Sequence, residues 1–258
     1  NKYDLVIIGG GGLVFLGANY FNFLQEGLKV PYIFSRVGID DRVVSQPVVA
    51  QLKQILGKAY EVTVRTGGDR NLAQKHFGID CRVVPEAIWN YEAEPFPLTA
   101  NGKKILVSMN AYASRYFSQV KEALSDPKTS KTIFTVSMQD TSKDFHYNIL
   151  STPENRVILP ESVSLHKKAS FIAAADLVIT SRLHAGLLAL SHGIPAIMLK
   201  STPKVRFLMK ELDLEGLYAD SGINAAMVED VLSKNMRIRL LELSRHMKEL
   251  SRGPILPE

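Results

Sequence analysis

The sequence predicts an α/β protein made of two Rossmann-like domains whose parallel sheets face a central cleft. Short β-branched runs alternate with helical patterns along the chain, which is the rhythm of parallel α/β units. The chain has 258 residues, 46% of them hydrophobic, and can therefore bury one large core or two modest ones. The alternation lapses only once, which divides the chain into two halves.

That lapse lies between residues 89 and 102. Pro95, Pro97 and an Asn-Gly pair in this stretch suit neither a helix nor a strand. We therefore expect one domain over residues 1–94 and a second over residues 95–258.

The expected strands are the β-branched runs that follow or precede turn residues. They cover residues 4–8, 31–35, 61–65, 82–85, 104–108, 132–137, 156–159, 177–180 and 194–199.

Four glycines, Gly9, Gly10, Gly11 and Gly12, follow the first expected strand, and we expect a helix after them. Glycines allow the backbone to approach a ligand closely, and a helix N-terminus offers free N–H groups to an anion. A tight turn of this kind can equally be a packing feature. It is not a dinucleotide fingerprint, because no acidic residue ends a second strand about 20 positions later.

The segment from residue 175 to 199 carries the strongest site pattern. We expect its strand to end at Thr180 and Ser181 to cap the following helix, which places Arg182 and His184 in the first helical turn. Cations are unfavourable there, because that end of the helix dipole is already positive. A bound anion would remove the conflict.

The next unit repeats this geometry. Thr202 is the expected N-cap, Pro203 the first helical residue and Lys204 the next. If the two strands are neighbours, Arg182, His184 and Lys204 converge on one rim. An Arg fork suits a carboxylate or phosphate, Lys adds a point charge and His transfers protons near neutral pH. The alternative is that these are solvated surface residues.

Arg65 ends an expected strand of the first domain, just before a helix that contains Asp69. Its side chain could reach the cleft from the opposite wall. An ion pair with Asp69 explains it equally well.

The overall charge favours anionic partners: the formal net charge is +5 and the isoelectric point is near 9.2. The basic residues do not form a motif with interleaved aromatics, which disfavours nucleic acid as the partner. No apolar run approaches the ~20 residues that span a bilayer, and the single cysteine, Cys81, cannot form an internal disulfide. These features indicate a cytoplasmic protein. No zinc spacing or P-loop is present, so we expect no metal site.

The segment from residue 234 to 252 is basic and amphipathic. Such a helix could contact the inner face of an anionic membrane, or close the fold with a solvated face.

Several of these segments, taken in order, resemble the motifs of polysaccharide pyruvyltransferases. The matching segments are Asp4–Leu13, Val62–Arg65, Ala174–Ile179, Ser181–Ala185, Gly193–Pro195 and Pro203–Val205.

The resemblance implies a GT-B-like fold, with residues 1–94 lacking the first strand unit of that domain. It implies transfer of pyruvyl from phosphoenolpyruvate to a free or lipid-linked saccharide, as a ketal, in cell-surface polysaccharide biosynthesis, without a cofactor. The implied donor-binding residues are Ser181, Arg182, Leu183, His184 and Lys204; the implied catalytic residues are His184, Arg182 and Arg65.

Two other functions stay open. A GT-B glycosyltransferase that uses a nucleotide sugar would share the fold and the basic helix termini. A catalytically inactive family member would bind the donor without releasing phosphate.

Overall fold

The computed structural model describes residues 3–25, 30–98, 102–125, 131–136, 158–159, 164–200 and 203–252. The chain forms two compact units, which are described separately. The first comprises Asn1–Ala87 with Met247–Glu258, and the second comprises Ile88–His246.

The irregular segment after residue 90 belongs to the second unit. The ring of Phe96 stacks on that of Phe171, with centroids 4.3 Å apart, and the backbone N–H of Ala93 donates to Nε2 of His192 over 3.2 Å. The sequence-based boundary at residue 95 therefore falls inside this unit, whose first residue is Ile88.

The first unit contains a parallel four-stranded sheet in which the chain always moves in the same direction, in the order β1-β3-β5-β6. A separate two-stranded parallel sheet pairs β2 with β4. These strands are β1 (Val6–Gly9), β2 (Val14–Phe15), β3 (Tyr32–Val37), β4 (Ile39–Asp40), β5 (Glu61–Val64) and β6 (Arg82–Val83).

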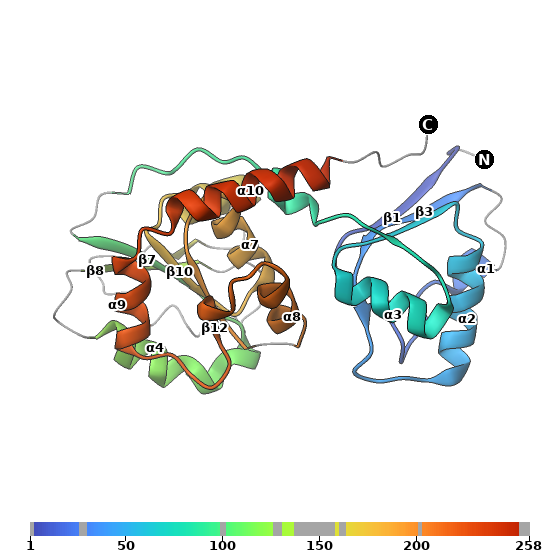
Figure 1. Ribbon diagram of the computed structural model, residues 1–258, viewed down its shortest axis with the longest axis horizontal. Helices are drawn as coiled ribbons and strands as arrows, with labels where there is room; N and C mark the ends of the chain where they lie inside the picture. Colours follow the sequence, from blue (N-terminus) through green and yellow to red (C-terminus); the bar gives the residue numbers. More distant parts are fainter. Residues whose placement is uncertain are drawn as a thin grey trace. The chain divides into compact units, whose positions relative to one another are not determined.

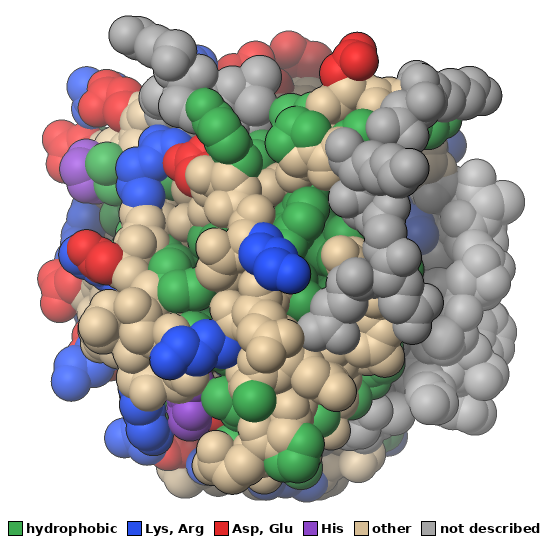
Figure 2. Space-filling model, turned by 90° about the vertical axis from the view of Figure 1, so that its right-hand side faces the viewer, with side chains coloured by type: hydrophobic (Ala, Val, Ile, Leu, Met, Phe, Trp, Pro, Cys, Tyr) green, Lys and Arg blue, Asp and Glu red, His purple; other side chains and the backbone are tan. Residues whose placement is uncertain are grey.

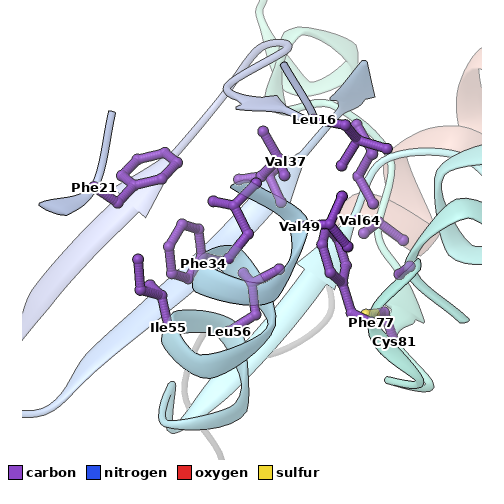
Figure 3. Close-up of a cluster of buried hydrophobic side chains, with 14 of the residues drawn as sticks. Leu16, Phe21, Phe34, Val37, Val49, Ile55, Leu56, Val64, Phe77 and Cys81 are labelled. Carbon is purple, nitrogen blue, oxygen red and sulfur yellow. The ribbon is translucent and has the colours of Figure 1, made fainter. Parts of the chain in front are cut away.

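Helices pack on this sheet through an apolar core. The helical segments are α1 (Asn22–Gln25), α2 (Gln46–Gly57) and α3 (Gly67–Phe77), and η1 (Ala87–Asn90) continues from this unit into the second. Figure 3 shows Phe34 of β3, Ile55 of α2 and Phe77 of α3 in one cluster, each 1% exposed. Burial of each such side chain stabilises the fold by about 1.5–3 kcal/mol.

The second unit contains a parallel six-stranded sheet in the order β12-β11-β10-β7-β8-β9. Its strands are β7 (Lys103–Ser108), β8 (Lys131–Val136), β9 (Ile158–Leu159), β10 (Leu177–Thr180), β11 (Ala196–Leu199) and β12 (Tyr218–Ala219). The chain runs outward from β7 to β9, then returns to the other side of β7 as β10. This is the doubly wound order of Rossmann folds, in which the direction reverses between the first and fourth strands.

The helices of the second unit lie between and after these strands. They are η2 (Ala111–Tyr116), α4 (Phe117–Leu124), α6 (Leu165–Ala173), α7 (Leu183–Ser191), α8 (Pro203–Glu211), η5 (Glu215–Leu217) and α9 (Ala225–Ser233), and α10 (Arg237–Ser251) contributes residues to both units. Helix α4 packs beside α9 (Figure 1), and α6 packs beside α7. None of the described helices is both long and apolar enough to cross a membrane.

The nine strands expected from the sequence are all present, with ends that differ by no more than two residues. The short strands β2, β4 and β12 were not expected. Each has only two residues.

The prediction of a helix directly after the four glycines is wrong. Gly10 and Gly11 have φ values of 81° and 72°, and the chain continues into β2. The N–H of Gly38 donates to the carbonyl of Gly11 over 2.8 Å, and that of Val14 donates to the carbonyl of Gly38 over 3.1 Å. This pairing with the segment after β3 keeps the backbone extended, so the glycines do not lead into a helix N-terminus.

Candidate functional site

The reversal of strand order in the second unit defines a candidate site at the carboxyl ends of β7 and β10. In open α/β sheets, ligands bind in the crevice at such a switch point. Ser108 ends β7, Thr180 ends β10, and the two residues are paired in register. The loops that follow these strands therefore meet at one place.

Hydrogen bonds join the two loops. The Thr180 hydroxyl donates to the carbonyl of Ser108 over 2.7 Å, and the N–H of Ser181 donates to the same carbonyl over 3.1 Å. The N–H of Asn110 donates to the Ser181 hydroxyl oxygen over 2.8 Å. All four residues are buried, so the loops form a single well-packed floor for the site.

The start of α7 differs in one detail from the expectation. Arg182, not Ser181, is the N-cap residue, with φ −94° and ψ 113°, and its N–H donates to the Thr180 hydroxyl oxygen over 2.8 Å. The Ser181 hydroxyl accepts from Asn110 instead of capping the helix. Arg182 therefore stands immediately before the helix.

Basic side chains and no acidic ones mark the beginning of α7. Arg182 is half-buried, Leu183 is half-buried and His184 is exposed. The first turn contains no acidic residue. Free N–H groups and the helix dipole favour an anion at this position.

The neighbouring strand brings Lys204 to the same edge of the sheet. Strand β11 pairs with β10 in parallel, which meets the condition for convergence that the sequence left open. Helix α8 begins at Pro203 as expected, Lys204 follows it half-buried, and the first turn again has no acidic residue. The expected cap, Thr202, lies outside the described residues.

Two buried polar atoms of the switch point have no hydrogen-bond partner within the described part of the chain. They are Oγ of Ser108 and Oδ1 of Asn110. A buried polar group left unpaired costs about 1–3 kcal/mol, so such groups call for a partner. Thr135 has a similar unpartnered hydroxyl, but its register partner is Val107, so it points to the opposite face of the sheet from Ser108.

Arg65 belongs to the first unit and contacts two carboxylates. Its Nε lies 3.5 Å from Oδ2 of Asp69, and its Nη1 donates to Oε1 of Glu86. The residue is 8% exposed. A Cβ added to Gly38 would lie 2.5 Å from Nε of Arg65, so the guanidinium packs directly against that backbone. These contacts show a buried ion-pair network within the unit.

The four glycines lie at the carboxyl end of β1, beside β3. A Cβ on Gly9 would approach the carbonyl oxygen of Ser35 to 3.1 Å, whereas a Cβ on Gly10 or Gly11 would meet nothing within 4 Å. Close packing is therefore seen at Gly9, and the four glycines and the basic residues of α7 and α8 belong to different units.

Comparison with known proteins assigns the family. A model of the family described as polysaccharide pyruvyl transferase matches residues 1–203. The chain belongs to the polysaccharide pyruvyl transferase family. A search of curated proteins finds no match. The matched range contains the glycine turn, Arg65 and the whole of α7, and ends at Pro203.

Solved structures similar to this pyruvyl transferase family member are GT-B proteins. The UDP complex of MnaA from S. aureus aligns over 93% of this chain and 68% of its own, at 14% identity and a TM-score of 0.59. A putative UDP-N-acetylglucosamine 2-epimerase from Listeria monocytogenes aligns over 94% of this chain and 68% of its own, at 16% identity and a TM-score of 0.60. The calicheamicin glycosyltransferase CalG4 aligns over 96% of this chain and 70% of its own, at 14% identity and a TM-score of 0.53. These similarities confirm the predicted GT-B-like α/β fold.

Sequence reasoning missed Ser108 and Asn110. The available signal was a polar residue ending a strand and another two positions later, a pattern that many loops share. Their importance depends on β7 lying beside β10, two strands separated by more than 60 residues. Only the strand order reveals it.

On the face shown in Figure 2, the visible Lys and Arg side chains are scattered and interspersed with acidic ones, so this face carries charges of both signs.

Proposed function

We propose that this chain transfers the enolpyruvyl unit of phosphoenolpyruvate to a saccharide as a ketal, in cell-surface polysaccharide biosynthesis. One observation carries the proposal: Arg182 and His184 stand at the beginning of α7, at the switch point of the sheet, with no acidic residue in the first turn. Family membership supports the same reaction.

The donor fits the charges of this edge. Phosphoenolpyruvate has a phosphate and a carboxylate, each of which the Arg182 guanidinium can bind through two parallel N–H groups. Lys204 supplies a point charge from the beginning of α8, and the backbone N–H groups at the start of α7 are further donors. We assign donor binding to this set, together with the Ser181 hydroxyl and the backbone N–H of Leu183.

His184 is our candidate for the proton donor. Its imidazolium gives a proton to the methylene carbon, which makes C2 electrophilic, and a sugar hydroxyl adds to C2. The bond from C2 to the phosphate oxygen then breaks, and a second hydroxyl of the same sugar closes the ketal. Of the two hydroxyl protons, one restores the imidazolium and the other leaves on phosphate, so atoms and charge balance.

Arg65 has a supporting role in this proposal. Its two carboxylate partners already neutralise the guanidinium, which favours a role in holding the carboxyl edge of the first sheet over direct donor binding.

The proposal places the reaction in the cytoplasm, where phosphoenolpyruvate is made. Helix α10 is the candidate for contact with the inner face of the membrane, because Ile238 is 65% exposed and Leu241 is 44% exposed, beside exposed Arg237 and Arg245.

Labelled donor tests the reaction directly. Phosphoenolpyruvate carrying ¹³C at C2 is incubated with the enzyme and a panel of saccharides, and NMR follows that carbon. We expect its signal to move from the vinylic to the ketal region with release of one phosphate per ketal. Release of phosphate with formation of free pyruvate at every saccharide would contradict ketal transfer.

A nucleotide-sugar glycosyltransferase is the second candidate. The fold similarity to MnaA, whose structure contains UDP, favours it. It predicts that UDP binds this chain, that phosphoenolpyruvate does not, and that the ¹³C signal remains vinylic.

A further inference from the structure

A second group of basic side chains lies farther along the carboxyl edge of the second sheet. Lys200 directly follows β11, and Asp220 directly follows β12. Nζ of Lys200 lies 2.5 Å from Oδ1 of Asp220, and Nη1 of Arg206, from α8, lies 3.8 Å from Oδ2. Three elements thus meet at one carboxylate.

Arg115 reaches the same place from η2. Its Nη2 donates to the carbonyl oxygen of Lys200 over 3.4 Å and to the Tyr116 hydroxyl over 2.9 Å, and its guanidinium lies 4.7 Å from the centre of the Tyr116 ring. The Tyr116 hydroxyl donates in turn to the carbonyl oxygen of Asp220 over 2.8 Å. These contacts hold Arg115 beside the ends of β11 and β12.

Charge within this cluster is unbalanced. Three cations, Arg115, Lys200 and Arg206, share Asp220, whose pKa is lowered by its hydrogen bond to Lys200 and by the charges of the three basic groups. The side chains of Lys200 and Arg206 are 44% and 67% exposed, so a ligand in solution can reach them. The cluster carries an excess of positive charge beside the beginning of α8.

Tyr218 adds an independent sign of a missing partner. Its hydroxyl is buried and has no hydrogen-bond partner among the described residues. Burial raises the pKa of this phenol, and the nearby Asp220 carboxylate raises it further, so the hydroxyl keeps its proton and remains a donor. A donor without an acceptor among the described residues, near Arg206 and Arg115, fits an anionic oxygen.

We propose that Arg115, Lys200, Arg206 and Tyr218 form a second anion subsite, which binds a phosphate or diphosphate group carried by the saccharide acceptor. This inference rests on the proposed function, because it gives the acceptor of that reaction a chemical class. Strands β10 and β12 are separated by β11, so the ends that carry Arg182 and Asp220 are about 10 Å apart. One sugar ring with its phosphate can bridge such a separation, with its hydroxyls at the donor and its phosphate at the cluster.

Exposed ion pairs often serve no ligand and contribute little to stability. The two explanations differ in the role of Asp220. In a ligand site, this carboxylate competes with the incoming anion for the same cations, so removing its charge strengthens anion binding. In a simple network of surface ion pairs, no variant changes the binding of an anion at this place.

Titration calorimetry at one low, fixed ionic strength tests the subsite with inorganic pyrophosphate, glucose 1-phosphate and phosphoenolpyruvate as probes. Lys200→Ala and Arg115→Ala should each weaken pyrophosphate and glucose 1-phosphate by about tenfold, the loss of one charge-assisted hydrogen bond. Asp220→Asn should bind both more tightly than wild type. The matched control Lys210→Ala removes an exposed cation from the other end of α8 and should change nothing. Phosphoenolpyruvate should bind all four variants as it binds wild type.

Unchanged binding of pyrophosphate to Lys200→Ala and Arg115→Ala would overturn the subsite. Equal losses for pyrophosphate and phosphoenolpyruvate would also overturn it, because a single site would then explain both. Binding of pyrophosphate without glucose 1-phosphate would overturn the sugar-phosphate assignment. If wild type fails to bind phosphoenolpyruvate but binds glucose 1-phosphate through Lys200, the proposed function falls and the subsite stands.

Discussion

The two units of this chain place basic residues at equivalent positions, after parallel strands, but balance their charge in opposite ways. Arg65 follows β5 and is buried between Asp69 and Glu86. Arg182 follows β10 and stands before a helix with no acidic residue in its first turn. The first arrangement pairs the cation with two carboxylates of the same unit. The second places the cation at the start of a helix, where we propose that an anion binds.

The two units also differ in the order of their strands. The first sheet runs in one direction from β1 to β6, whereas the second reverses between β7 and β10. A reversal creates a crevice at the carboxyl edge, and a sheet that runs in one direction lacks this feature. We therefore assign donor chemistry to the second unit and structural charge pairing to the first.

The largest expected effect is on catalysis by His184. His184→Gln should lower turnover by about two to four orders of magnitude at saturating donor, because the proton donor is lost. His246→Gln is the matched control, since both residues are exposed and lie on helices. Turnover of His184→Gln close to that of wild type would remove this residue from proton transfer.

Replacement of Arg65 should affect stability more than binding. Arg65→Ala leaves Asp69 and Glu86 buried without their cation and should lower the free energy of unfolding by about 3–5 kcal/mol, measured in denaturant. Arg70→Ala, which breaks the exposed pair with Asp80, should leave that free energy unchanged. If Arg65→Ala keeps its stability and loses phosphoenolpyruvate binding, the contrast between the units is wrong.

Structural features that depend on neighbouring residues in the sequence were predicted, whereas those that depend on contacts between distant residues were not. The strands and the start of α8 were predicted because β-branched runs and Pro203 act locally. The predicted N-cap of α7 was wrong because the Ser181 hydroxyl oxygen accepts a hydrogen bond from the N–H of Asn110, which lies 71 positions away in the sequence. The helix after the glycines was wrong for a similar reason, because Gly11 pairs with Gly38.

The residues of the candidate site also differ in whether local sequence or strand order determines their position. The positions of Arg182, His184 and Lys204 were predicted because each follows a strand and lies at the beginning of a helix, which the sequence displays. Asn110 and Asp220 were missed because their positions depend on which strands are neighbours. The partners of Arg65 show both cases: Asp69 lies four residues away and was foreseen, whereas Glu86 comes from the segment after β6 and was not.

A smaller effect should follow the packing of Gly38 on Arg65. Gly38→Ala places a methyl group within 2.5 Å of the guanidinium and should destabilise the first unit by about 1–3 kcal/mol. Gly57→Ala is the control: nothing lies within 4 Å of the added Cβ, so stability should stay equal or rise slightly. Equal stabilities for the two variants would show that Arg65 moves freely.

The smallest effect concerns Cys81 in the core of the first unit. Burial raises the pKa of this thiol from 9.0 to about 11. The folded state therefore holds the proton more tightly than the unfolded state, so stability is full below pH 9 and falls as pH rises towards 11. Cys81→Ala should remove this part of the pH dependence, measured as unfolding free energy at pH 8 and pH 10.5. The same slope in both proteins would assign it to other groups.

Thermal stabilisation by phosphoenolpyruvate tests the central claim, that the carboxyl edge of the second sheet binds the donor. Ligand at 100 times its Kd stabilises the folded state by about 2.7 kcal/mol, enough to raise Tm measurably. We predict a rise in Tm with phosphoenolpyruvate that is lost in Arg182→Ala. UDP and inorganic phosphate, which the second subsite can bind, should give smaller rises that are the same in wild type and in Arg182→Ala. No rise in wild type, an equal rise in Arg182→Ala, or a larger rise with UDP would contradict the account.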